Sequence, residues 1–231
     1  MMLQEKGGRM GHAAKEAAVA GWSVTAARIA MLAIALSLTA LMLLHVLSPE
    51  YAWSWRLVSE YTNGRYPWLL TLVFLSWAAG SFALVWAIRP LGATALGKAG
   101  LAFLLLAGIG QVMGGAFDIN HGLHGPAAII GIPSLCIAAV LVTMAMARHA
   151  GIVAPPLWTA HLPWIGFALM LGAFALLLSA LADAGVDLST QTRPLADLPA
   201  GVSGYVGWAN RLIFASTYLW VVLAALAVIR R

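Results

Sequence analysis

The sequence contains very little charge. Only 9% of its 231 residues are Asp, Glu, Lys or Arg, whereas 62% are apolar. Soluble globular domains average about 25% charged residues, so this composition excludes an ordinary soluble domain. The apolar runs are long and do not alternate with polar residues, which excludes the strands of a membrane β-barrel. In a bilayer this leaves helices, which satisfy their own backbone hydrogen bonds.

Several chemical signatures are also missing. The single cysteine, Cys136, excludes an intramolecular disulfide and any metal site built from several cysteines. The sequence has no phosphate-binding glycine loop, no Gly-x-Ser-x-Gly turn and no paired histidines deep in an apolar run. These absences argue against an NTPase, a lipase-type hydrolase and a haem cytochrome. No inverted repeat or pair of broken helices is evident, which argues against a transporter.

Six apolar segments are present, each near the length of roughly 20 residues that crosses a bilayer. They predict an all-α fold, a six-helix transmembrane bundle formed by residues 25–231. The expected spans are Thr25–Val46, Trp68–Ile88, Gly100–Ala116, Ala127–Met146, Leu157–Ala182 and Val206–Ile229. Residues 1–24 are expected to form a basic cytoplasmic tail. No small-x-small cleavage motif follows the first span, which predicts a retained signal anchor.

The basic residues divide unequally between the two sides of this arrangement. Nine fall on the side of the termini: Lys6, Arg9, Lys15, Arg28, Arg89, Lys98, Arg148, Arg230 and Arg231. Four fall on the other side: Arg56, Arg65, Arg193 and Arg211. The side richer in Lys and Arg remains in the cytoplasm, so both termini are expected to be cytoplasmic. Six of the eight acidic residues fall on the outer side, which indicates that the polar chemistry lies there.

The first outer loop carries helix signals. The sequence Ser48-Pro49-Glu50 is a start signal and Asn63-Gly64 is a stop signal, so a short interfacial helix is expected between them. Arg56 and Glu60 are four residues apart and are expected to form an ion pair. Aromatic residues around this helix are typical of a belt at headgroup level. The last outer loop, 185–205, is long enough to be either a lid or a linker.

The third span carries small and polar residues within its apolar sequence. Gly110 and Gly114 form a small-xxx-small pair, which lets a neighbouring helix approach closely. Gln111 shares a helical face with Gly115 and Asp118, so its amide is directed along the stripe that leads to the outer side. We expect Gln111 to form an interhelical hydrogen bond.

The segment after this span contains Asp118, His121 and His124 at three-residue spacing. A carboxylate and two neutral imidazoles are zinc ligands, and an open fourth position would hold water. Glycines and a proline in the same segment predict a turn, so helical spacing does not apply. Three interpretations follow: caps of helix ends or partners of nearby charges, a metal site, and a proton-linked or headgroup-binding site.

Arg211 lies about one turn inside the sixth span. A guanidinium at that depth must reach outward or find a partner. Asp118 and Glu60 are the expected partners, within salt-bridge distance. His45 ends the first span on the same face.

Parts of the sequence resemble a family of prokaryotic six-span membrane proteins, the domain of unknown function 998 family. The matching segments are Ser59-Glu60-Tyr61, Trp68 to Gly80, Gly115-Ala116-Phe117-Asp118 and His124-Gly125-Pro126-Ala127-Ala128. The likeness covers most of residues 30–230, and His124 rather than His121 is assigned to the family histidine. The proline expected before Asp118 is replaced by Phe117. The resemblance implies the six-span topology and a prokaryotic inner-membrane location, and it implies no activity.

Two functions are consistent with these features. The leading hypothesis is a protein without enzymatic activity, whose outer pocket binds a lipid headgroup or a protein partner, including as an accessory subunit of a larger membrane complex. Its pocket residues would be Ser59, Glu60, Asp118, His124 and Arg211. The alternative is a metal-dependent membrane hydrolase, in which Asp118, His121 and His124 hold zinc and Glu60 is the base. The chain lacks the further histidine pair of the alkaline ceramidase type, which it resembles only loosely. The leading hypothesis expects no cofactor, and neither hypothesis involves nucleic acid.

Overall fold

The fold was analysed in a computed structural model that describes residues 2–187 and 195–230, with side chains from residue 21 onward. Residues 1, 188–194 and 231, which include Arg193 and Arg231 of the charge pattern, lie outside the described residues. The described chain is helical and contains no strand. Its long helices are α1 (Met2–Leu47), α2 (Pro67–Ala87), α3 (Ala95–Ala116), α4 (His124–Ala147), α5 (Leu157–Asp183) and α6 (Val206–Ile229).

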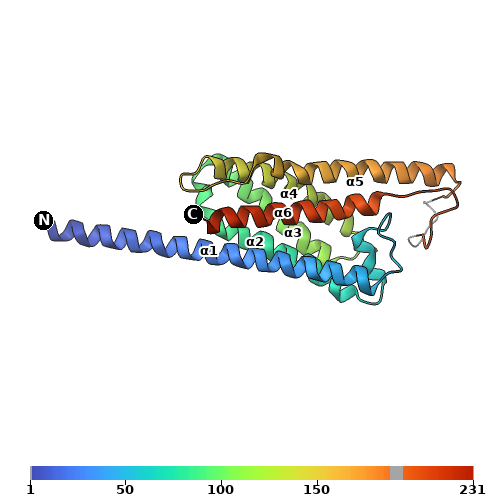
Figure 1. Cartoon of the computed structure of the whole chain (residues 1–231), viewed down its shortest axis with the longest axis horizontal. Coiled ribbons are helices and arrows are strands. Elements are labelled where there is room, and N and C mark those ends of the chain that lie inside the picture. The colour runs from blue at the N-terminus through green and yellow to red at the C-terminus, as the bar shows by residue number, and fades with distance from the viewer. Residues whose placement is uncertain (1, 188–194, 231) are drawn as a thin grey trace.

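All six predicted spans are confirmed. Six helices in the described part of the chain are long and apolar enough to cross a membrane, within a few residues of the expected bounds. The largest difference is the start of α3, five residues earlier than predicted, because the Thr94 side chain accepts a hydrogen bond from Gly97 N and caps the helix there. Helix α1 also continues back to Met2, so it projects far beyond the other helices (Figure 1).

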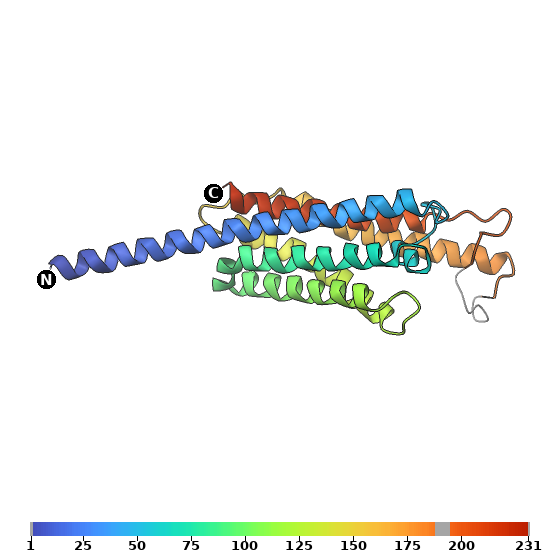
Figure 2. The same ribbon diagram turned by 90° about the horizontal axis from the view of Figure 1, so that it is seen from below.

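The helices form a closed ring in chain order. Each packs against the next, and α6 packs against α1 to complete the ring (Figures 1 and 2). Helix α6 also touches α2 and α4 and is the most buried of the six, whereas α5 is the least buried. Helix α1 begins and α6 ends at the same end of the bundle. The opposite end, where α1 ends and α2 begins, is called the loop end below.

Hydrogen bonds between side chains join the helices inside the bundle. Ser37 Oγ donates to the carbonyl of Val73, 2.7 Å away, and therefore accepts from the hydroxyl of Tyr218 at 2.6 Å. Trp220 Nε1 donates to Thr143 Oγ1 over 3.0 Å. Because hydrocarbon offers no alternative partners, such bonds fix the rotation of α1, α2, α4 and α6 about their axes.

The predicted close approach at Gly110 is confirmed. A Cβ atom at this position would lie 2.4 Å from the Cα of Gly131, so the α3 and α4 backbones touch. Gly114 serves a different neighbour, since a Cβ there would meet the ring of Phe74 on α2 at 3.1 Å. The two glycines therefore let α3 pack tightly against helices on two sides.

The first loop at the loop end contains a short helix, η1 (Val58–Asn63). It is a six-residue 3-10 helix, shorter than the segment between the start and stop signals, because turns occupy most of residues 49–55. Tyr61 is fully buried beneath it. The position of this helix relative to a membrane interface stays a prediction.

The charge pattern yields a prediction about orientation. A reporter that is active only in the cytoplasm, fused after Arg231, should be active. The same reporter inserted after Gly201 should be inactive, since the positive-inside rule places that loop outside. Activity at Gly201 together with inactivity after Arg231 would reverse the orientation.

The helix contact yields a prediction about stability. Gly110→Ala should lower the free energy of unfolding by about 1–3 kcal/mol, because the new methyl group overlaps the α4 backbone. Thermal unfolding in detergent measures the change. Gly172→Ala on α5 is the matched control, because its Cβ would meet nothing within 4 Å. Equal melting temperatures for the two variants would contradict the assigned contact.

Candidate functional site

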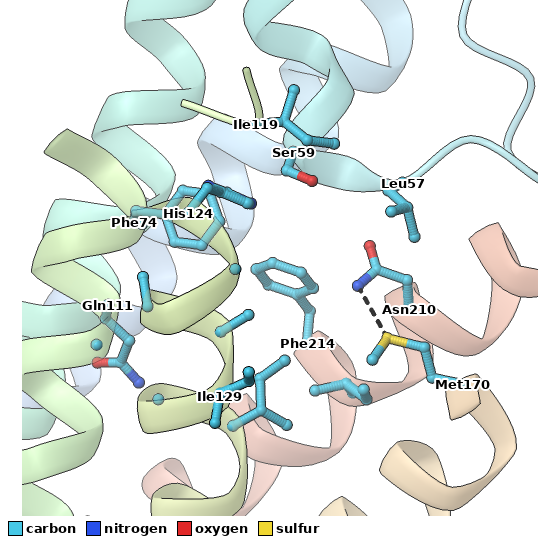
Figure 3. A pocket seen from close by; sticks show the side chains of 18 of the residues that line it. Leu57, Ser59, Phe74, Gln111, Ile119, His124, Ile129, Met170, Asn210 and Phe214 are labelled. Atoms are coloured by element: carbon cyan, nitrogen blue, oxygen red, sulfur yellow. Dashed lines mark hydrogen bonds between the residues drawn. The ribbon is translucent and has the colours of Figure 1, made fainter. Parts of the chain in front are cut away.

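The most prominent cavity lies between α2, α3, α4, α5 and α6, towards the loop end, and has a volume of about 440 Å³. This is within the usual range for small-molecule pockets. Figure 3 shows Leu57, Ser59 and Ile119 at one end, with Phe214 in the centre. The walls are mainly apolar and aromatic.

The cavity opens sideways between α4 and α5. Three of its lining side chains are also exposed on the outer surface of the bundle: Ile129 on α4 is 74% exposed, and Leu171 and Phe174 on α5 are 53% and 42% exposed. All three lie within the membrane-spanning helices. The mouth of the cavity therefore faces the region that lipid chains would occupy.

Four polar side chains line the cavity: Ser59, Gln111, His124 and Asn210. Asn210 Oδ1 accepts from the backbone N–H of Val58 at 2.9 Å, and its Nδ2 lies 3.6 Å from the sulfur of Met170. His124 Nδ1 donates to the carbonyl of Phe117 at 2.8 Å. In the neutral ring, Nε2 of His124 is then an acceptor.

Gln111 forms the predicted interhelical bond, because Ser81 Oγ on α2 donates to its Oε1 at 2.8 Å. The other half of the amide is not satisfied. Nε2 of Gln111 is buried without a hydrogen-bond partner, and so is Nε1 of Trp77, which lines the same cavity. An unsatisfied buried donor costs about 1–3 kcal/mol, so these two groups need a reason.

The roof of the cavity is the loop that carries Leu57 and Ser59, and two arginines fix it. Arg56 Nη1 donates to Glu60 Oε2 at 2.6 Å, which confirms the predicted ion pair. Arg56 Nη2 donates to the carbonyl of Ala196 at 3.1 Å, and its guanidinium lies over the ring of Trp55 at 4.3 Å. The second oxygen of Glu60 accepts from Leu57 N at 2.9 Å.

The second arginine, Arg211, has neutral partners, so the predicted ion pair with Asp118 or Glu60 is wrong. Its Nε donates to His45 Nε2 at 2.6 Å, and its Nη1 to the carbonyls of Arg56 at 2.8 Å and Gly207 at 3.0 Å. Glu60 is unavailable because Arg56 and a backbone N–H already occupy its two oxygens. Sequence spacing alone does not reveal this competition.

The partners of Arg211 are held in their neutral forms by geometry and burial. His45 must keep Nε2 free of a proton to accept from Arg211, so its Nδ1 donates to the carbonyl of Leu41 at 2.5 Å. Arg211 Nη2 donates to the hydroxyl of Tyr61 at 3.3 Å. Burial raises the pKa of Tyr61 more than the nearby guanidinium lowers it. The guanidinium thus joins α1, α6 and η1.

The turn after α3 does not gather its ionisable residues. Asp118 Oδ1 accepts from Asn120 N at 2.8 Å, and His121 Nδ1 accepts from Leu123 N at 3.1 Å. The ring of His121 stacks on Phe117, with 4.7 Å between centroids. Within residues 2–187 and 195–230, no three His, Cys, Asp or Glu side chains are grouped to hold a metal ion. The arrangement therefore does not fit the zinc site of the alternative hypothesis.

The five residues of the expected pocket take three different positions. Ser59 and His124 line the cavity, whereas Glu60 and Arg211 fix its roof. Asp118 lies in the exposed turn. The sequence analysis did not place Asn210 in the pocket, although Asn210, Ile213 and Phe214 share one helical face and could have indicated it.

The cluster around Arg211 yields a prediction about stability. Arg211→Leu should lower the free energy of unfolding by about 3 kcal/mol, because it removes donors from several buried acceptors at once. Thermal unfolding in detergent measures the loss. Arg65→Leu removes the same charge from an exposed position and should change stability little. A melting temperature for Arg211→Leu equal to that of Arg65→Leu would show that the cluster does not hold the bundle.

Comparison with known proteins gives one family. The family described as Protein of unknown function (DUF998) matches residues 31–227, which include all six membrane-spanning helices in whole or in large part. No curated protein and no solved structure matches the chain. The match covers well over half of the sequence and agrees with the resemblance found in the motifs around Glu60, Asp118 and His124. The chain is a multi-pass membrane protein that belongs to the DUF998 family.

Proposed function

We propose that this protein binds a membrane lipid in the cavity between α2 and α6. The observation that carries the proposal is the sideways mouth between α4 and α5, lined by the exposed side chains of Ile129, Leu171 and Phe174. A water-soluble ligand gains nothing from an entrance within the hydrocarbon region. A lipid reaches it by lateral diffusion and leaves its chains partly in the bilayer.

The distribution of polar groups supports the same ligand class. Ser59 and His124 lie near the roof, where they would contact the polar end of a lipid, and Asn210 lies close to them (Figure 3). The rest of the lining is mainly apolar and would contact the chains. A mainly apolar pocket with a few placed polar groups is typical of small-molecule sites.

The proposed location is the prokaryotic inner membrane, with the roof on the outer side. The excess of basic residues on the side of the termini supports this orientation. Binding without chemistry is the simpler function, because the described residues hold no grouped metal ligands. The lipid-bound protein would act alone or as an accessory subunit of a larger membrane complex.

Filling the cavity tests the proposal. Ala128 lines the cavity on α4, so Ala128→Phe should place a ring in the space of the ligand. The protein is purified in mild detergent, and the retained lipid is extracted and measured by mass spectrometry. We expect the lipid-to-protein ratio to fall at least about fivefold in Ala128→Phe, because the ring and a lipid chain would overlap.

Ala175→Phe is the matched control, since Ala175 is exposed on α5 and does not line the cavity. It should retain as much lipid as the unchanged protein. Retention of the same amount of lipid by Ala128→Phe, with a normal melting temperature, would contradict lipid binding in the cavity.

A further inference from the structure

The cavity contains two buried donors that nothing in the protein satisfies. Gln111 is 3% exposed and Trp77 is 4% exposed, and neither Nε2 of Gln111 nor Nε1 of Trp77 has a hydrogen-bond partner. The described residues contain only five such buried side-chain atoms, and these two belong to the lining of one cavity. Their coincidence in one wall is therefore the feature that needs an explanation.

The orientation of Gln111 is set from outside the cavity. Ser81 Oγ on α2 donates to Gln111 Oε1, which leaves the NH₂ group as the free half of the amide. In Figure 3 the nitrogen of Gln111 lies on the cavity side and the oxygen lies away from it. Trp77 precedes Ser81 by four residues, so the indole and the hydroxyl lie on the same face of α2, one turn apart.

Both groups require an acceptor, and this limits the ligand. The indole N–H of tryptophan is only a donor, so a hydroxyl or ammonium group of a ligand cannot satisfy it through hydrogens. No Lys or Arg is among the residues that line the cavity. A phosphate or carboxylate there would be an unpaired charge in an apolar space, which is strongly unfavourable. A neutral carbonyl oxygen meets both conditions.

The depth of the donors excludes the headgroup as the source of the acceptor. Trp77 is ten residues from the start of α2 at Pro67, about 15 Å along the helix axis. This is close to the middle of a hydrocarbon core of about 30 Å. The acceptor therefore belongs to a part of the ligand that enters the hydrocarbon region.

We propose that the ligand is a neutral carbonyl-bearing lipid, whose carbonyl oxygen accepts hydrogen bonds from Gln111 Nε2 and Trp77 Nε1. This inference rests on the proposed function and specifies its ligand. Two sources supply such an oxygen, the acyl ester of a glycerolipid and the ring of an isoprenoid quinone. The site binds the carbonyl, and the aromatic walls formed by Phe74 and Phe214 accept either a chain or a ring.

Competition between matched lipids tests the carbonyl. The protein is reconstituted in nanodiscs that contain equal amounts of diester and diether phosphatidylcholine with identical chains, which differ only in the carbonyl groups. After mild delipidation, the retained lipids are quantified by mass spectrometry. We expect the ester lipid to be enriched about tenfold over the ether lipid, as one or two hydrogen bonds would give. In a second arm, decylubiquinone is added to nanodiscs of ether lipid alone. Retention of the quinone in place of the ester preference would identify the quinone as the source.

Single variants separate this role from packing. Trp77→Phe keeps the aromatic ring and removes only the N–H, so it should reduce the enrichment without preventing folding. Gln111→Leu should do the same. In ether lipid, where the donors have no acceptor, neither variant should lower the melting temperature by more than the control, Trp158→Phe, whose indole is exposed on α5.

The outcomes are distinct from those of the broader proposal. Retention of ester and ether lipid in equal amounts, with no quinone retained, would overturn the carbonyl assignment and leave lipid binding intact. An ester preference that is unchanged in both Trp77→Phe and Gln111→Leu would also overturn it. Failure of the proposed function itself would appear as no retained lipid of either kind and no effect of Ala128→Phe.

Discussion

The guanidinium of Arg211 is the group on which the loop end of the bundle depends. A charge at this position requires satisfied hydrogen bonds, and the acceptors come from α1, α6 and the loop before η1. His45 is thereby restricted to one neutral tautomer, and Tyr61 is held beneath the loop. Because the same loop carries Leu57 and Ser59 into the cavity, the shape of the roof follows from one buried cation and its neutral partners.

Composition and periodicity were sufficient to predict the bundle. Each span is a long apolar run, and the bilayer permits few alternatives to a helix, so the elements do not depend on distant contacts. The glycine pair also predicted a close approach correctly, since only backbone geometry is involved at Gly110. For Gln111, the general need of a buried amide for a partner indicated the interhelical bond before Ser81 was identified.

The polar residues at the loop end were harder to predict. Glu60 has two candidate arginines, and only the three-dimensional path of the loop decides that Arg56 takes it. The spacing of Asp118, His121 and His124 permits convergence, yet the turn between α3 and α4 uses their side chains for local hydrogen bonds. The cavity was not predictable for a related reason: its lining comes from five helices and a loop, and no single segment carries its pattern.

Helix α5 is 27 residues long, which corresponds to about 40 Å, whereas a bilayer core is about 30 Å thick. Such a mismatch is relieved by tilting, and α5 is the helix least restrained by its neighbours. Since one side of the mouth of the cavity is formed by α5, its tilt sets the width of the entrance. The thickness of the surrounding bilayer is therefore coupled to ligand access, so that a thin membrane and a thick one present the same binding site behind entrances of different width.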